Sequence, residues 1–225
     1  MESTGKDVIE LNSDIKRSVY RWYADQYDIN DLSNYTAYLL ANYCMPTLLK
    51  LKPSSLFRVS RRLISDQQSF LRLLENEINT FHSAYSILYE DESMMIILVY
   101  NETLLREVIS GPEEQSFLYS MGYSFNGDTM QNILTTLTYR YYEFIRSRSS
   151  HCIHPYPHEI GIILGYPIQD VKDFIRFNGK NYTLCGYWKV YHEEDHARRT
   201  FKKYNQLKEK ALKGILSGKK LKESI

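Results

Sequence analysis

Residues 154–191, HPYPHEIGIILGYPIQDVKDFIRFNGKNYTLCGYWKVY, form the stretch that specifies the fold most completely. Pro157 stands where the first residue of a helix is favoured, and Glu159 follows in the first turn, where the helix dipole favours an anion. Gly165 can adopt the left-handed conformation that ends a helix, and Pro167 can begin the next one. The stretch therefore predicts a hairpin of two short helices, followed by an extended aromatic segment.

A small sheet is predicted upstream of this hairpin. Runs at 56–59, 85–89 and 94–100 are rich in strand-forming residues, and an acidic turn connects the last two. The last run is apolar enough for a central strand. Helical patterns alternate with these runs, because Asp66 and Asn101 each stand where they can cap an apolar periodic segment.

We therefore predict an α+β fold, with a small β-sheet and packed helices, then a helical hairpin and a long C-terminal helix over residues 193–216. One α+β domain is expected over residues 31–207, with its sheet-containing part at 54–122 and its hairpin part at 154–191. Two further segments flank that domain: a polar N-terminal segment with a first helix, 1–30, and a basic helix end and tail, 208–225.

The composition narrows the class of protein. The net charge is only +1, so the whole chain has no field that would favour nucleic acid or a membrane. Three cysteines are too few and too scattered for a disulfide framework. The first residues lack the apolar core of a signal peptide, and no apolar run reaches the roughly eighteen residues of a membrane span. We expect a cytoplasmic protein with reduced thiols and no membrane span.

The helical hairpin has the spacing of a helix-turn-helix motif, whose second helix enters the major groove of DNA. The side of that helix predicted to be exposed carries Gln169, Asp170, Lys172 and Asp173. Its carboxylates oppose binding, because affinity for DNA depends on neutralising phosphates. A hairpin that only packs is favoured, and nucleic acid stays an open but less favoured partner.

Cysteine and histidine side chains suggest a second kind of site. Cys44, His158, Glu159 and Cys185 offer the thiolate, imidazole and carboxylate groups that bind zinc or iron, and a metal site would use Cys44, His158 and Cys185. The chain contains no C-x-x-C pair to support this. The alternative is that the cysteines are small hydrophobic residues of the core.

Cys44 is also a candidate nucleophile. It lies at the predicted end of a helix beside Pro46 and Thr47, where a reactive thiol would make the protein a cysteine-dependent enzyme. A helix C-terminus raises the pKa of a thiol, which opposes this role.

Aromatic residues suggest a third kind of site. The rings of Tyr187, Trp188 and Tyr191, around Gly186, could form walls for a flat cofactor or a nucleobase, and Lys189 could reach an anionic group on it. The alternative is that these rings only close the core over the two helices, because aromatic side chains dominate protein cores.

The C-terminal region is basic, with lysines and arginines far outnumbering carboxylates after Arg198. Such a face is most often only solvated. An acidic partner, nucleic acid and a membrane surface are the alternatives.

Several motifs together resemble a family of uncharacterised proteins of anaerobic Gram-positive bacteria, a domain of unknown function. The motifs are C-x-P-T-L at 44–48, P-H-E-I-G-x-x-L-G-Y-P at 157–167 and C-G-Y-W-K-V-Y at 185–191. The resemblance covers about residues 31–207 and brings no catalytic residue with it. It implies a link to redox or iron economy, and with it a redox or iron-related protein partner.

We therefore predict an accessory or binding protein that holds a metal or a redox cofactor of unknown identity. The alternatives are a helix-turn-helix DNA-binding regulator and a cysteine-dependent enzyme. The candidate site residues are Cys44, Pro46, Thr47, His158, Glu159, Tyr166, Cys185, Tyr187, Trp188 and Lys189.

Overall fold

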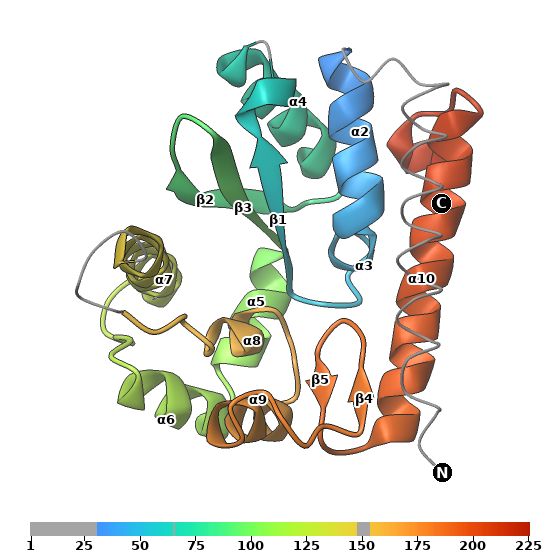
Figure 1. Ribbon diagram of the computed structural model, residues 1–225. Coiled ribbons are helices and arrows are strands. Elements are labelled where there is room, and N and C mark those ends of the chain that lie inside the picture. The colour runs from blue at the N-terminus through green and yellow to red at the C-terminus, as the bar shows by residue number, and fades with distance from the viewer. Residues whose placement is uncertain (1–30, 65, 148–153) are drawn as a thin grey trace.

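The computed structural model describes residues 31–64, 66–147 and 154–225 of the chain. The N-terminal segment 1–30, with its expected first helix, lies outside the described residues. Within them the fold is α+β, as the sequence predicts, with a small sheet, packed helices and a long C-terminal helix (Figure 1).

Three antiparallel strands form the main sheet: β1 (Ser54–Ser60), β2 (Ala84–Glu90) and β3 (Met94–Tyr100), in the order β1-β3-β2. The turn between β2 and β3 is fixed by Asp91, whose carboxylate accepts hydrogen bonds from the Ser93 and Met94 amides at 2.7 and 2.9 Å. An aspartate in this position commonly closes such a turn. The connection is therefore the hairpin that the sequence predicts.

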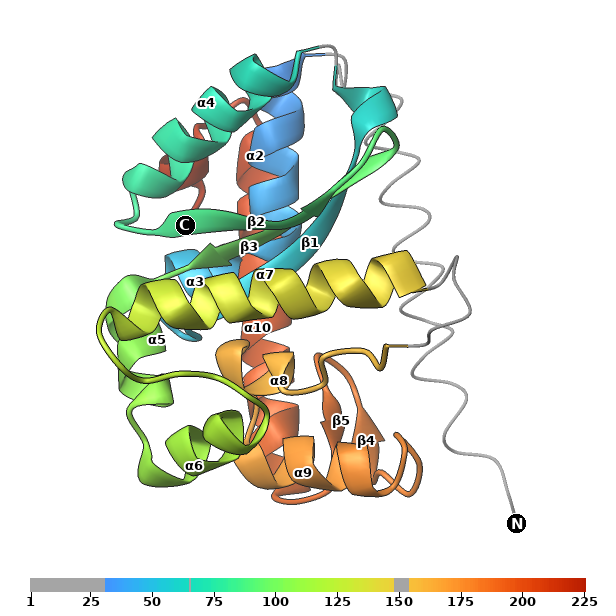
Figure 2. The ribbon, with the colours of Figure 1, turned by 90° about the vertical axis from the view of Figure 1, so that its left-hand side faces the viewer.

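The middle strand β3 is buried on both faces, and this divides the interior into two cores. Met95, Ile97 and Val99 pack on one face with α2 (Leu32–Tyr43) and α4 (Gln67–Asn79). The alternate residues of β3 pack on the other face with α5 (Glu102–Ile109) and α7 (Thr129–Ser147). Figure 2 shows α7 crossing one side of the sheet, with α2 and α4 on the other.

Short polar side chains set the helix starts. Asp66 accepts hydrogen bonds from the Gln68 and Ser69 amides at the start of α4, and Asn101 accepts one from the Leu104 amide at the start of α5. These caps satisfy backbone donors that have no partner within the helix. The starts predicted at Asp66 and Asn101 are confirmed.

The remaining elements have nine residues or fewer, except for the last helix, α10 (Glu194–Leu216). They are α3 (Met45–Leu48), η1 (Arg61–Leu63), α6 (Pro112–Ser120), α8 (Ile160–Ile163), α9 (Ile168–Arg176), β4 (Leu184–Cys185), β5 (Lys189–Val190) and η2 (Leu221–Ser224). No described helix is long and apolar enough to cross a membrane.

The helical hairpin is confirmed, but its first helix is shorter than expected. α8 begins at Ile160 rather than at Pro157, because the residues before it form turns: the His158 amide bonds to the Tyr156 carbonyl and the Ile160 amide to the Pro157 carbonyl. The preference of proline for a first helical position therefore does not set the start of this helix.

The C-terminal helix α10 contacts both the main core and the small β4–β5 hairpin. Ala211 and Ile215 near its end are buried with α2 and α4, whereas Ala197 and Phe201 near its start pack against Val190 of β5. Figure 1 shows α10 extending from this hairpin to the side of α2. α10 thus connects the β4–β5 hairpin to the core on one face of the main sheet.

A glycine allows the turn between α8 and α9 to lie close to the start of β1. Gly165 has a φ of +75°, and a Cβ atom there would lie 2.4 Å from Pro53 Cδ. The Ser54 hydroxyl donates a hydrogen bond to the Ile163 carbonyl at 2.7 Å. The helical hairpin is therefore held against the sheet at this turn.

Replacing Gly165 by Ala should destabilise the protein more than replacing Gly127. Both glycines have positive φ, so each alanine incurs the cost of a left-handed backbone, about 1–2 kcal/mol. Only at Gly165 would the new Cβ also clash, because nothing lies within 4 Å of that position at Gly127. Denaturant unfolding measures both losses, and equal losses would contradict the close approach to Pro53.

Candidate functional site

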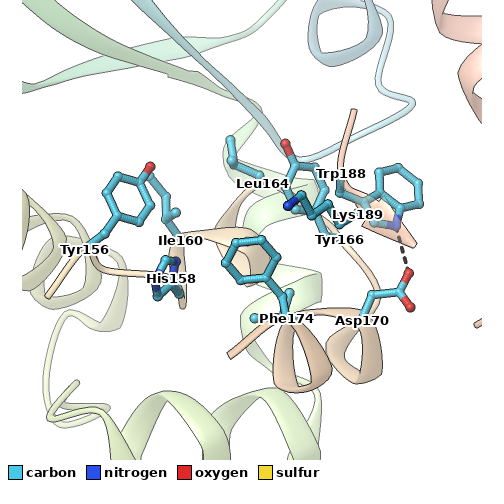
Figure 3. A pocket seen from close by; sticks show the side chains of 11 residues that line it. Tyr156, His158, Ile160, Leu164, Tyr166, Asp170, Phe174, Trp188 and Lys189 are labelled. Atoms are coloured by element: carbon cyan, nitrogen blue, oxygen red, sulfur yellow. Dashed lines mark hydrogen bonds between the residues drawn. The ribbon is translucent and has the colours of Figure 1, made fainter. Parts of the chain in front are cut away.

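A cavity of about 210 Å³ lies where α8, α9 and the β4–β5 hairpin meet. Figure 3 shows Tyr156 and His158 on one side of it, Tyr166 and Trp188 on the other, and Phe174 and Lys189 between them. The side chains that line it are mostly aromatic or aliphatic: Tyr156, His158, Ile160, Gly161, Leu164, Tyr166, Asp170, Val171, Phe174, Trp188 and Lys189.

Two stacked rings form one wall of the cavity. Tyr166 stacks on Trp188 with ring centroids 5.3 Å apart, and Trp188 meets the ring of Phe201 of α10 edge to face at 4.6 Å. Such ring pairs stabilise a fixed arrangement by about 0.5–1.5 kcal/mol each beyond their burial. The wall is therefore ordered by protein contacts before any ligand is bound.

Asp170 fixes this wall, and its position corrects a prediction. The sequence predicts an exposed Asp170, yet only 2% of the residue is exposed. Its carboxylate accepts hydrogen bonds from Trp188 Nε1 at 2.7 Å and from the Tyr191 and His192 amides, both at 2.9 Å. Buried carboxylates need such donors. They come from a segment about twenty residues later, which the periodicity of α9 cannot indicate.

His158 lies opposite this wall. Its imidazole packs at a tilt against the rings of Tyr156 and Phe174, with centroids 5.2 and 5.0 Å away. Burial lowers the pKa of His158, although the nearby Glu159 carboxylate opposes the shift, so the ring is neutral near pH 7. Neither ring nitrogen has a hydrogen-bond partner among the described residues, which leaves one donor and one acceptor for a ligand.

Lys189 brings a positive charge to the cavity. Its ammonium donates a hydrogen bond to the Gly179 carbonyl at 2.6 Å and lies over the rings of Phe174 and Tyr182, 5.7 and 4.7 Å from their centroids. No carboxylate of the described residues forms an ion pair with it. Two of its three N–H donors are therefore available.

A second cation lies behind the stacked wall. Lys52 is only 8% exposed, and its ammonium is 5.5 Å from the ring centroid of Tyr166. Burial lowers its pKa to about 8, against a smaller opposing influence of Cys44. Within the described part of the chain this ammonium also has no ion-pair or hydrogen-bond partner.

The structure brings some of the predicted site residues together and separates others. His158, Tyr166, Trp188 and Lys189 line the cavity. Tyr187 does not, because it packs on Tyr204 of α10.

Glu159 also lies outside the cavity lining. It is buried, and its carboxylate accepts hydrogen bonds from Tyr123 Oη at 3.1 Å and from Arg140 Nε. It thus connects the turn before α8 to α7.

Cys44, Pro46 and Thr47 lie in the interior beside β1, away from the cavity lining. Cys44 belongs to the core formed with α2 and α4, and Thr47 shares a 2.8 Å hydrogen bond with Ser55. Burial raises the pKa of the Cys44 thiol, which disfavours the thiolate that a nucleophile or metal ligand needs.

The described residues contain no group of three or more His, Cys, Asp or Glu side chains placed to hold a metal ion, so Cys44, His158 and Cys185 do not form one. Cys185 is a partly exposed residue of β4, opposite Lys189 in the register. His154 and His158, four residues apart, belong to no such group either, and the chain between them is not helical.

The exposed side of α9 is largely engaged within the protein. Lys172 forms an ion pair with Glu113 of α6 at 2.5 Å, Gln169 donates to the same carboxylate at 2.8 Å, and Asp173 lies 2.7 Å from His192. A recognition helix needs these side chains for base edges and phosphates. This packing favours the alternative of a hairpin that packs against its neighbours.

Sequence reasoning missed Tyr156, Asp170 and Phe174 as site residues. Phe174 shares the apolar side of α9 with Val171, so the pattern assigns it to the core, although it also faces the cavity. The aromatic and histidine-rich run at 154–158 is the signal that could have suggested Tyr156.

The family profile described as "Protein of unknown function (DUF3793)" matches residues 40–225. The chain belongs to this family. No curated protein and no solved structure matches the chain. The family match extends to residue 225, beyond residue 207, where the resemblance of the sequence motifs ends. The additional residues include Leu212, Ile215 and Leu221, which are buried in the core with α2 and α4.

Asp170→Ala should detach the β4–β5 hairpin from α9. Three N–H groups lose their acceptor, and an unsatisfied buried donor costs about 1–3 kcal/mol, so the loss of stability should reach about 3 kcal/mol. Hydrogen exchange should show lost protection at the Tyr191 and His192 amides. The control Asp173→Ala removes only a partly exposed pair with His192 and should cost less than about 1 kcal/mol. Unchanged exchange in Asp170→Ala would refute the assigned role.

Lys52→Met should stabilise the protein at neutral pH but not at high pH. The pKa of Lys52 is about 8 in the folded protein and 10.5 in the unfolded chain. Between these pH values the unfolded chain binds more protons than the folded protein, so the stability of the wild type rises with pH. The advantage of Lys52→Met should therefore be about 3 kcal/mol near pH 7 and vanish near pH 10.5.

Urea unfolding of the wild type and of Lys52→Met between pH 7 and 10.5 measures the difference in stability. The titration of Cys44 affects both proteins, so it largely cancels from this difference. The exposed Lys203→Met should show no such dependence. A pH-independent difference for Lys52→Met would show that the ammonium is not buried in solution.

Proposed function

We propose that this protein is a non-catalytic binding protein that holds a small planar molecule in the cavity between His158 and Trp188. One observation carries the proposal: aromatic rings line a preformed space, and the polar groups beside it keep hydrogen-bonding capacity that the protein does not use. Apolar walls with a few polar groups are typical of small-molecule sites. The imidazole of His158 and the ammonium of Lys189 supply those groups.

The size of the cavity limits the ligand. Its volume of about 210 Å³ exceeds the roughly 150 Å³ of a cavity that holds benzene and falls below the roughly 300 Å³ at which sites for drug-sized molecules begin. One ring or two fused rings fit, and a complete dinucleotide does not. A redox cofactor at this site would therefore have to be small, or only its ring would lie within the cavity.

The other parts of the proposal have separate support. A link to redox or iron economy, with a protein partner from it, rests on the family resemblance alone. The cytoplasmic location is supported by the free thiols of Cys44 and Cys185. The burial of Cys44 and the packing of α9 against α6 favour a binding protein over a cysteine-dependent enzyme or a DNA-binding regulator.

Trp188 provides the test, because Trp22 is the other of the two tryptophans in the chain. In a Trp22→Phe background, a ligand that stacks in the cavity should change the fluorescence of Trp188 and raise the melting temperature. A set of one- and two-ring molecules should contain binders with Kd of about 1 mM or lower, a normal affinity for ligands of this size.

Phe174→Ala should weaken that binding at least about tenfold, because the ring forms part of the cavity wall. The matched control Tyr119→Ala removes a ring from α6 that is 73% exposed and should leave binding unchanged. If no molecule of the set binds, or if both variants weaken binding equally, the proposed site is wrong.

A further inference from the structure

The charges around the cavity do not balance. Lys189 lines the cavity with its ammonium against the rings of Phe174 and Tyr182, and the ammonium of Lys52 lies against the ring of Tyr166, which is part of the lining. The one carboxylate in the lining is Asp170, and its oxygens already accept hydrogen bonds from three N–H groups of the β4–β5 hairpin. Asp170 is therefore committed to the hairpin and is not a counter-ion for either lysine.

Lys52 is buried and Lys189 is partly exposed. The aromatic face beside Lys52 compensates only part of the free energy that removing an ammonium from water costs. Only 8% of Lys52 is exposed. Neither Lys52 nor Lys189 forms an ion pair with a described carboxylate. The site therefore has a positive potential that an anion would complement.

The polar atoms that face the cavity fit such an anion. Lys189 retains two N–H donors beyond the one bound to Gly179, and Figure 3 shows its side chain beside Phe174 in the lining. The neutral His158 can donate one further hydrogen bond, and the Tyr166 hydroxyl has no hydrogen-bond partner among the described residues. Burial raises the pKa of Tyr166 to about 12, so this hydroxyl stays protonated and adds no negative charge beside the cavity.

We infer that the ligand is a small aromatic acid, whose ring lies among Phe174, Tyr166 and Trp188 and whose carboxylate binds Lys189. This inference rests on the proposed function, because it specifies the ligand of the same cavity. One carboxylate matches the one ammonium that lines the cavity, and Lys52 strengthens the positive potential from behind Tyr166. A larger anion, such as a nucleotide, would have to extend out of the cavity.

The test compares acids with amides of the same shape. Benzoate and indole-3-carboxylate are titrated against benzamide and indole-3-carboxamide, with the fluorescence of Trp188 as the signal in the Trp22→Phe background. Each acid should bind at least about tenfold more tightly than its amide, because a charge-assisted hydrogen bond is worth about 1.5–3 kcal/mol. Added salt should weaken the acids and not the amides.

Lys189→Met should abolish the preference for acids, because the acids lose their ion pair whereas the amides lose only a hydrogen bond. An unchanged melting temperature of the free protein shows that the cavity is still folded. Lys189→Arg should restore the preference, because it keeps the charge. The matched control Lys203→Met removes an exposed cation of α10 and should change nothing.

The outcomes separate this inference from the proposed function. If amides bind as tightly as acids, or if the cation benzylamine binds more tightly than either, the anionic ligand is wrong and the binding cavity stands. If acids, amides and benzylamine all fail to perturb Trp188, the inference and the proposed function both fail.

Discussion

The hydrogen bonds accepted by the Asp170 carboxylate are the interaction on which the site depends. β4 and β5 contain two residues each, and a strand pair of that size has little stability of its own. Asp170 joins this hairpin to α9 through one side-chain and two backbone donors. The same contact fixes the indole of Trp188 against Tyr166, so the cavity wall and the attachment of the hairpin have a single physical cause.

The position of the cavity follows from the two-sided burial of β3. Because both faces of the strand are apolar, one core forms with α2, α4 and the end of α10, and the other with α5, α7 and α8. The β4–β5 hairpin packs on the start of α10. The cavity lies between α8 and α9 on one side and the β4–β5 hairpin on the other, where these short elements do not pack completely against one another.

The chemistry of the site depends on which of its polar groups already have partners within the protein. Glu159 is paired with Arg140 and Tyr123, and Asp170 with the hairpin, so the buried carboxylates are structural. Lys189 and the imidazole of His158 retain free donors or acceptors. A site with committed carboxylates and an available ammonium selects negative charge, and its aromatic walls select a flat molecule.

The sequence by itself determined the three strands of the sheet, the longer helices, the caps at Asp66 and Asn101 and the turn at Gly165, because these depend on residues close together in the chain. It also identified His158, Tyr166, Trp188 and Lys189, which line the cavity. Only the tertiary structure decided that Asp170 is buried, that Phe174 and Tyr156 join the site, and that Cys44 does not. A periodic pattern records which side of an element is apolar, whereas the burial of a charge depends on donors from distant segments.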